Sequence, residues 1–509
     1  MAAALRLAGH DVVVLCQETR PEEILGFIDA WGSVDESGVS FLSRRSAPEG
    51  GRCIVLRPAI GSLLPVFVLD EYVGFRAVRF VDLQDDELNS YLERSIAALR
   101  AAAAWHRPEF VIVGHAMPGP VVARRALGSG RYVGIVHGSD LEYAVGRQAR
   151  YRDLAIEGLR GAAAVIGLSE DILRRTVAIV PQIRGRTRAI HPGVDADRFH
   201  PETRTAALDE TAAALEADTG SVRGRPESLD LEVRKALSAR DASRFETLAR
   251  SYDQTVPDPD ASIRLGALSG RAGPLIGYFG KLIPQKGVHL LIQALPQMRN
   301  APEAVIVGFG LHREWLSALV QAIAAGDAAA LQWLGEAGGM ELLNGPDTTL
   351  SPNLQRRITF TGRLDHRYAP GVLAALDVLV VPSLADEAFG LVAAEGAAAG
   401  ALPLVARHSG LAEVADALES AVGRPGLFSY DPAGDVIRNI ADGVDSLLAI
   451  DAHERSLLRR ALADFVGSQW TWKRAAAELL VASRLEEERG SPGGHVPRGR
   501  SLETWSKDR

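Results

Sequence analysis

The sequence predicts an α/β fold with two doubly wound, Rossmann-like domains. Short apolar runs recur in both halves of the chain, and runs without polar alternation are typical of strands that are buried on both faces of a parallel sheet. Helical stretches rich in Ala and Leu separate the runs, which is the alternating order of an α/β domain. The length of 509 residues exceeds what one hydrophobic core usually holds, so two cores are expected.

The apolar runs mark the expected strands and fall into two series. The first series, for an N-terminal domain, occupies residues 11–16, 110–115, 132–138 and 164–169. The second series, for a C-terminal domain, occupies residues 275–280, 304–310, 357–362, 377–383 and 402–407. Between the first two runs, a long helix is expected to begin with Asp85 as its N-cap, because a short acidic side chain suits that position.

The domain limits follow from these two series. We expect an N-terminal domain over residues 1–185 and a C-terminal domain over residues 186–465. Inside the second domain, the interval from about 203 to 266 holds no apolar run and is dense in charge. A helical insertion is therefore expected there.

The two ends of the chain carry further expectations. An amphipathic helix is expected over residues 466–488, where Trp470 and Trp472 could anchor it on the N-terminal domain by burying aromatic surface. Packing on its own domain is the alternative. Residues 489–509 are polar and contain Gly and Pro, so we expect them to be disordered.

The first residues resemble the end of a helix that stops at Gly9, directly before the first apolar run. A Rossmann-like domain normally opens with a strand and a glycine-bearing turn ahead of such a helix. That first strand is missing from these residues, and we expect it upstream of Met1. The start also lacks the basic residues and the apolar centre of a signal peptide.

Composition and charge argue against a nucleic-acid-binding protein, a disulfide- or zinc-stabilised protein and a membrane-spanning protein. The formal net charge of −8 provides no global basic field for a nucleic-acid partner. Cys16 and Cys53 lie inside apolar runs and are interpreted as buried small hydrophobes, because two cysteines are too few for a disulfide framework or a zinc site. No run approaches the roughly 20 apolar residues of a membrane helix. These features favour a cytoplasmic protein.

A lysine-bearing loop gives the strongest chemical signal. In YFGKLIPQKGVHLLIQAL, residues 278–295, a strand ends at Gly280, and Lys281 and Lys286 flank a short loop before Gly287 and an apolar helix. A diphosphate leaving group needs positive charge and free N–H groups where its charge develops. Loop lysines supply the charge and helix N-termini supply the N–H groups. Two solvated surface lysines are the alternative.

A second segment, SLADEAFGLVAAEGAAAG over residues 383–400, places two carboxylates beside a helix start. Gly390 lets a phosphate approach the backbone closely. Side chains of a helix lean toward its N-terminus, so Glu395 would lean toward the same end, within reach of a ribose. Glu387, ahead of the helix, could meet a sugar. Ordinary solvated acids near a helix start are the alternative.

In their order and spacing, these segments resemble the retaining nucleotide-sugar glycosyltransferases of family 4, which have the GT-B fold. Four motifs carry the resemblance: E-x7-E from Glu387 to Glu395, G-[RK]-L-x-x-x-K-G from Gly280 to Gly287, a linker of the I-P-N-G-V-D type from Ile190 to Asp195, and FTGRL over residues 360–364. The resemblance is close over about 267–410 and loose in the N-terminal half. It implies two Rossmann-like domains that face each other across a cleft.

The resemblance also implies a role for each matching residue. Lys281 and Lys286 would bind the diphosphate, and Glu387 would hold hydroxyls of the donor sugar. Lys281 stands where the family often has arginine, which keeps the charge but loses a bidentate fork, and His191 stands where asparagine is usual. Further donor-binding positions are Gly280, Arg363 and Leu364 near the base, Phe389, Gly390 and Leu391 through their N–H groups, and Glu395 at the ribose.

Histidines at two strand ends could line the cleft from the N-terminal domain. His137 ends YVGIVHG, where the family often places a histidine that faces the reacting sugar, so the resemblance implies a contact to a donor hydroxyl or a backbone carbonyl. His115 ends FVIVGH and is a second candidate. For both, a histidine with ordinary partners at a strand end is the alternative. Gly308 and Gly310 lack the third glycine of a dinucleotide site, and their loop is expected under the nucleotide base.

The function that the resemblance implies is retaining transfer of a hexosyl unit from a UDP- or GDP-linked donor to an unidentified small-molecule, glycan or lipid acceptor. In that family the leaving phosphate takes the acceptor proton, so no protein nucleophile, divalent metal or other cofactor is expected. A lipid acceptor would bring peripheral contact with the inner membrane face. Two alternatives stay open: a GT-B nucleotide-sugar epimerase or hydrolase, and a non-catalytic nucleotide-sugar-binding protein.

Overall fold

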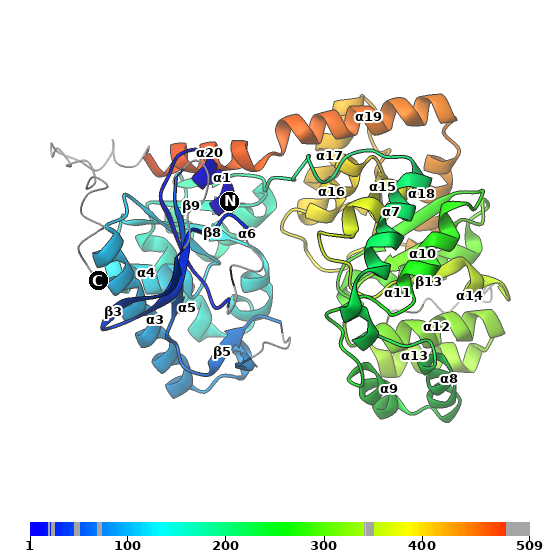
Figure 1. Cartoon of the computed structure of the whole chain (residues 1–509), viewed down its shortest axis with the longest axis horizontal. Coiled ribbons are helices and arrows are strands. Elements are labelled where there is room, and N and C mark those ends of the chain that lie inside the picture. The colour runs from blue at the N-terminus through cyan, green and yellow to red at the C-terminus, as the bar shows by residue number, and fades with distance from the viewer. Residues whose placement is uncertain are drawn as a thin grey trace.

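Two α/β halves lie side by side in the computed structural model, and two consecutive helices near the end of the chain lead from the second half back to the first (Figure 1). The structure describes residues 1–18, 21, 26–44, 51–68, 74–340, 342 and 351–484. The predicted tail 489–509 lies outside the described residues.

The second half contains a six-stranded sheet in which every pair of neighbouring strands is parallel. The strand order is β13-β12-β11-β14-β15-β16. The strands are β11 (Leu275–Phe279), β12 (Glu303–Val307), β13 (Ile358–Phe360), β14 (Val378–Val381), β15 (Leu402–Ala406) and β16 (Ser429–Tyr430). Because the order reverses between β11 and β14, the carboxyl ends of these two strands border the crevice where doubly wound sheets bind ligands.

Helices cover this sheet and complete its core. They are α11 (Val288–Ala294), α12 (Arg313–Ala325), α13 (Ala328–Gly338), α14 (Leu354–Arg357), α15 (Ala369–Ala375), α16 (Leu391–Ala399), α17 (Ser409–Val422), α18 (Val436–Leu448) and α19 (Ala452–Gln469). Strand residues such as Ile276, Val380 and Leu402 have no exposed surface, as expected for a sheet with both faces covered. The apolar runs of the second series thus form the strands that the sequence predicts.

The charge-dense interval before this sheet is helical. It forms α7 (Arg204–Glu216), α8 (Leu229–Ala239), α9 (Ala242–Ala249) and α10 (Ala261–Ser269). Leu208, Phe245 and Leu265 are fully buried and belong to the same hydrophobic cluster as the strands of the second half. The helical interval therefore shares the core of that half.

The first half holds two four-stranded sheets, in the orders β1-β4-β2-β3 and β10-β9-β8-β7, and a two-stranded sheet, β5-β6. Its strands are β1 (Val12–Leu15), β2 (Ala30–Asp35), β3 (Gly38–Arg44), β4 (Cys53–Pro58), β5 (Leu63–Val66), β6 (Arg76–Arg79), β7 (Val111–Gly114), β8 (Tyr132–Val136), β9 (Ala164–Gly167) and β10 (Thr187–Ala189). Each run of the first series forms a strand, although the run at 11–16 and the other three belong to different sheets. The antiparallel pair β2-β3 was not predicted, because its residues alternate in burial instead of forming an apolar run.

Helices of the first half pack on these sheets, and one of them corrects a prediction. They are α1 (Ala2–Leu7), α3 (Asp85–His106), α4 (Gly119–Leu127), α5 (Ala149–Gly161) and α6 (Glu170–Ile179). The N-cap of α3 is Gln84 and Asp85 is already helical, so the expectation for Asp85 was wrong by one residue. The Glu87 carboxylate accepts the backbone N–H of Gln84 at 3.1 Å, and this capping box sets the earlier start.

Over the residues that the structure describes, the chain crosses between the halves twice, and the two crossings touch. After β10 the chain passes through Gly193 into the second half, and after α19 it returns at Trp470. The backbone N–H of Val194 donates to the carbonyl of Trp470 at 2.8 Å. A Cβ atom on Gly193 would lie 2.1 Å from the backbone nitrogen of Trp472, so only glycine fits at this crossing.

The last described helix, α20 (Trp472–Arg484), lies along the first half (Figure 1). Its Ala475, Leu479 and Ala482 share a buried cluster with Val133 of β8 and Ile166 of β9. Of the helical stretch expected over 466–488, the described residues 466–484 belong to two helices, because the chain breaks at Trp470 and turns toward the other half. Within the described residues, no helix combines the length and the apolar character that crossing a bilayer requires.

Candidate active site

Three loops meet at the carboxyl ends of the second half's central strands. Backbone hydrogen bonds join the loop after β11 to the loop after β12, through Gly280 N to Val307 O at 3.1 Å and Leu282 N to Phe309 O at 2.7 Å. The loop after β14 joins the β11 loop, because Leu384 N donates to the Gln285 carbonyl at 2.8 Å. These bonds place the loop after β11, which carries Lys281 and Lys286 (the lysine loop), beside the loop after β14, which carries Glu387. Both loops lie at the crevice predicted by the strand order.

Gly287 allows this close approach. Its φ is +68°, and a Cβ atom there would lie 1.8 Å from the carbonyl oxygen of Pro382. Any other residue would push the two loops apart. The glycine of the lysine motif thus has a packing reason that is independent of any ligand.

Lys286 and Glu387 are in direct contact. The Lys286 ammonium forms an ion pair with Oε1 of Glu387. The same carboxylate oxygen accepts the hydroxyl of Ser383 at 2.5 Å, and the Glu387 N–H donates to Oγ of Ser409 at 2.9 Å. The side chains of Lys286 and Glu387 are 32% and 20% exposed, so a ligand can reach both of them.

Lys281 lies at a different corner of the same loops. Its ammonium is 5.6 Å from the centroid of the Phe309 ring, and the guanidinium carbon of Arg363 is 4.9 Å from that centroid. Phe309 was not among the predicted site residues, yet it joins two of them through cation–π contacts. Leu364, also predicted near the base, is buried in the core of the second half.

The helix that follows Glu387 begins after a glycine in the left-handed region. Gly390 has φ +92°, and a Cβ atom there would lie 2.5 Å from the Leu411 side chain. The Phe389 side chain turns away from the loops and stacks on His191 at 5.1 Å between ring centroids. Phe389, Gly390 and Leu391 therefore offer the site their backbone, and the first turn of α16 carries N–H groups that have no partner inside the helix.

Glu395 lies one turn into α16 and is mostly buried. Its side chain is 16% exposed, and Oε1 is 3.8 Å from Nε2 of His366. Burial raises the pKa of this carboxyl to about 7. In the unliganded protein Glu395 is therefore largely protonated in mildly acidic solution, and a group that donates hydrogen bonds would favour its ionised form.

The raised pKa of Glu395 predicts a pH dependence of stability. Because the folded protein holds this proton more tightly than the unfolded chain, the free energy of unfolding should fall as pH rises from about 4.5 to about 7. For this partly exposed group the loss should be about 2 kcal/mol. Chemical denaturation of the wild type and of Glu395→Gln across this range measures the effect. The variant should lose that part of the slope, and parallel curves for the two proteins would contradict the prediction.

Two histidines face the crevice from the first half. His137 follows β8 and His115 follows β7, and their rings lie 4.7 Å apart. Burial is the main cause that lowers both pKa values, that of His115 to about 4, so both rings are neutral at pH 7. His115 has φ +69°, an uncommon backbone conformation for a side chain of this size.

Asp140 lies beside His115 and was missed by sequence reasoning. It is fully buried, accepts the N–H of Leu141 at 3.0 Å and the N–H of Ala116, and lies 3.8 Å from Nδ1 of His115. The sequence shows only an aspartate three residues after His137. Its link to the β7 loop depends on the pairing of β7 with β8, which the local pattern does not reveal.

The two halves touch beside these loops. The Glu413 carboxylate of α17 accepts the N–H groups of Glu170 and Asp171 at 2.9 and 2.7 Å, and so caps the first turn of α6 from the other half. Arg175 of α6 lies 3.3 Å from Asp386 of the β14 loop. A Cβ atom on Gly138, next to His137, would lie 3.5 Å from the side chain of Ala388. His137 therefore lies close to the Glu387 loop.

The structure thus brings Lys286, Glu387 and the start of α16 together, with Lys281 and Arg363 around Phe309 on the neighbouring loops. Glu395 lies below the start of α16, and His137 faces the Glu387 loop from the other half. In the part of the chain that the structure describes, no group of three or more His, Cys, Asp or Glu side chains could hold a metal ion.

Two models of known protein families match this chain. The model of the glycosyl transferases group 1 family matches residues 269–461, and the model of the glycosyl transferase 4-like domain matches residues 1–193. The chain therefore belongs to the family 4 glycosyltransferases, glycosyl transferases group 1, with the GT-B fold. Residues 194–268, which include most of the helical interval, lie outside both matches.

Individual relatives are distant. The chain is 28% identical over 227 residues to the glycogen synthase of Mycobacterium tuberculosis, covering 44% of this chain and 46% of the relative. It is 27% identical over 243 residues to the GDP-mannose-dependent alpha-(1-6)-phosphatidylinositol monomannoside mannosyltransferase of the same species, covering 45% and 52%. The matches thus span about half the length of these curated relatives.

Among solved structures, the sucrose-phosphate synthase of Thermosynechococcus elongatus is similar over 86% of this chain and 90% of that chain, with a TM-score of 0.51 and 17% identity. At that identity the similarity shows the fold alone. The prediction of two Rossmann-like domains in a GT-B arrangement is confirmed.

Proposed function

We propose that this protein is a retaining glycosyltransferase that moves a hexosyl unit from a UDP- or GDP-linked sugar to an acceptor hydroxyl without a divalent metal. The observation that carries the proposal is the contact of Lys286 with Glu387 at the point where the strand order reverses. A cation and a carboxylate in that crevice suit the two ends of a nucleotide sugar, its diphosphate and its hydroxyl-bearing ring.

Charge stabilisation comes from the lysine loop and the start of α16. When the bond between the anomeric carbon and the diphosphate oxygen breaks, negative charge collects on the diphosphate. Lys286 and the N–H groups at Gly390 and Leu391 would stabilise that charge. Lys281, over the Phe309 ring, would add a second cation from the same loop. These groups take the part that a metal ion plays in other transferases.

The carboxylates would hold hydroxyl groups. Glu387 accepts the Ser383 hydroxyl in this structure, and a sugar hydroxyl would bind the same carboxylate in the same manner. Glu395 would accept the ribose hydroxyls, which favour its ionised form and offset the cost of its burial. His137, neutral at pH 7, would contact a donor hydroxyl from the opposite wall of the crevice.

Retention would follow from attack on the face that the diphosphate leaves. The acceptor oxygen forms the new bond to the anomeric carbon while the bond to the diphosphate oxygen breaks. The acceptor proton passes to the departing phosphate oxygen, so atoms and charge balance without a protein base. The family relationship supports this route, and the names of the relatives, a glycogen synthase and a mannosyltransferase, support a hexosyl donor.

The deciding experiment incubates the full chain with UDP- and GDP-linked hexoses and a panel of small-molecule, glycan and lipid acceptors, with and without EDTA. The proposal expects a new glycosidic bond with the anomeric configuration of the donor, formed equally well with the chelator. Free sugar as the main product in every mixture would indicate a hydrolase. Binding of a nucleotide sugar without turnover would indicate a non-catalytic binding protein.

A further inference from the structure

The segment that follows β15, residues 407–410, binds the backbone of the loop that carries Glu387. The Glu387 N–H donates to Oγ of Ser409 at 2.9 Å, and the N–H of Gly410 donates to the Glu387 carbonyl at 3.0 Å. A Cβ atom on Gly410 would lie 2.6 Å from the backbone of Ala388, so the two segments pack closely at this point. Both backbone polar groups of Glu387 are therefore held by residues 409 and 410.

Ser409 holds its position in an uncommon backbone conformation. Its φ is +50°, in the left-handed region that glycine enters freely and that a residue with a Cβ atom rarely adopts. A glycine would relieve the backbone strain at this position, so the backbone does not explain the serine. Glycine would not supply the hydroxyl. The hydroxyl is therefore what Ser409 adds to this segment.

The Ser409 hydroxyl is bonded to the neighbouring histidine. Nε2 of His408 lies 2.7 Å from the carbonyl oxygen of Ser383, and Nδ1 of His408 lies 3.1 Å from Oγ of Ser409. Because a carbonyl oxygen can only accept, Nε2 carries the proton of the neutral ring and Nδ1 accepts the Ser409 hydroxyl. The Asp386 carboxylate is 3.6 Å from Nδ1, beyond ordinary hydrogen-bond distance. The Ser409 oxygen thus directs its proton to His408 and a lone pair to the Glu387 N–H.

These bonds form a ring that closes on the Glu387 carboxylate. The Ser383 hydroxyl donates to Oε1 of Glu387 at 2.5 Å, and Ser383 is 3% exposed. The ring therefore runs from the Glu387 N–H through Ser409, His408 and Ser383 back to the Glu387 side chain. A network in which each group has its partner holds its members in one arrangement. Lys286 contacts the same carboxylate oxygen, so the ring fixes the carboxylate at the candidate active site.

We propose that Ser409 and His408 are positioning residues of the transfer reaction, which act through Glu387 and determine how its carboxylate meets the hydroxyls of the donor sugar. The inference rests on the proposed function and adds to it two residues that lie outside the sequence motifs of the site. Because the ring holds the group that binds the sugar, its loss should weaken binding of a nucleotide sugar and leave binding of the nucleotide alone unchanged.

The test compares the wild type and Ser409→Gly by calorimetric titration of the full chain with UDP-glucose and UDP, and with GDP-mannose and GDP. The variant should bind the nucleotide sugar about tenfold more weakly, which corresponds to one lost hydrogen bond, and the matching nucleotide as the wild type does. Its midpoint of thermal unfolding should equal or exceed that of the wild type, because glycine relieves the strain at φ +50°. A serine that served only the fold would give the opposite pair of results.

Arg107→Gly is the matched control. Arg107 is exposed, has φ +53° and ends α3 in the first half, so glycine relieves the same kind of strain there, and affinity for all four ligands should stay at the wild-type value. Unchanged affinity of Ser409→Gly for the nucleotide sugar, or an equal loss for nucleotide sugar and nucleotide, would overturn the inference. A wild type that binds none of the four ligands would instead contradict the proposed function itself.

A second variant decides the matter if Ser409→Gly does not fold. His408→Phe keeps an aromatic ring and removes both nitrogens, so the Ser383 carbonyl and the Ser409 hydroxyl lose their partner. It should show the same selective loss for the nucleotide sugar, about three- to tenfold, because Ser409 can still accept the Glu387 N–H. His453→Phe, which replaces an exposed histidine of α19, should match the wild type. Wild-type affinity of His408→Phe for the nucleotide sugar would overturn the inference.

Discussion

Replacement of Lys286 by alanine is expected to lower kcat/KM for the nucleotide-sugar donor by about 30- to 1,000-fold. This corresponds to about 2–4 kcal/mol of transition-state stabilisation, the scale of one preorganised group at a developing charge. Lys286 is the cation that contacts Glu387, and the bond to the diphosphate breaks between these two groups in the proposed reaction. Steady-state kinetics with the donor that the wild type uses measures the loss.

Two further variants separate charge from position. Lys286→Arg keeps the charge and should recover part of the activity, whereas Lys235→Ala removes a lysine whose side chain is 63% exposed on α8 and should behave like the wild type. Circular dichroism during thermal unfolding checks that each protein is folded. A folded Lys286→Ala protein with turnover within about threefold of the wild type would remove Lys286 from the mechanism.

Replacement of Arg225 by methionine is expected to lower the free energy of unfolding by about 3–5 kcal/mol. The substitution leaves the Glu314 carboxylate, which is fully buried, without its bidentate partner and with the Tyr252 hydroxyl as its remaining donor. The free-energy cost of a buried carboxylate without a partner is far larger than the stabilisation that the packed methionine side chain still provides. Urea denaturation, followed by circular dichroism, measures the change.

The matched control for Arg225 lies two residues away. Arg223→Met breaks the ion pair with Asp253, but the Arg223 side chain is 63% exposed, so a loss of at most about 1 kcal/mol is expected. The double variant Arg225→Met/Glu314→Met removes both charges and should recover much of the stability that Arg225→Met loses. Equal losses for Arg225→Met and Arg223→Met would show that burial of this pair does not determine its contribution.

Local patterns predicted most of the second half because its strands and loops are encoded by nearby residues. An uninterrupted apolar run such as 378–381 specifies a strand buried on both faces, and Glu387 and Gly390, which follow it, must then lie beyond its carboxyl end. The contact between Lys286 and Glu387 follows once both loops are assigned to adjacent strands. The sequence could therefore predict this part of the candidate site.

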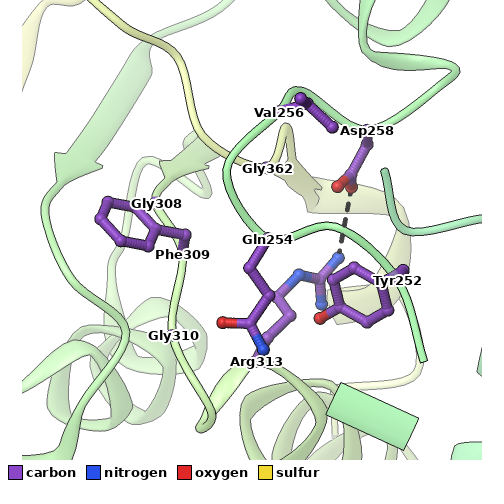
Figure 2. A pocket seen from close by; sticks show the side chains of 9 residues that line it. All are labelled: Tyr252, Gln254, Val256, Asp258, Gly308, Phe309, Gly310, Arg313 and Gly362. Carbon is purple, nitrogen blue, oxygen red and sulfur yellow. Dashed lines mark ion pairs between the residues drawn. The ribbon is translucent and has the colours of Figure 1, made fainter. Parts of the chain in front are cut away.

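Contacts between distant segments escaped prediction. Phe309 was not identified because its role depends on Lys281 and Arg363, which approach it from two other loops. Gln254 and Arg313 line one small pocket beside Phe309 only because the helical interval folds back over the sheet (Figure 2). In the first half, β2 and β3 pair antiparallel and the residues of β2 alternate in burial, so these strands show no apolar run that distinguishes them from loops.

The paired crossings at Gly193 and Trp470 determine how the crevice can open. Two backbone passages bonded side by side bend together about one axis, whereas rotation about the long axis of the molecule would separate Val194 from Trp470 and break their hydrogen bond. Motions of the two halves that keep this hydrogen bond are therefore those in which both crossings bend together. The Glu413 carboxylate, which binds the first turn of α6 from the other half, lies near His191 and so beside these crossings, where a small rotation of the halves changes its distance least.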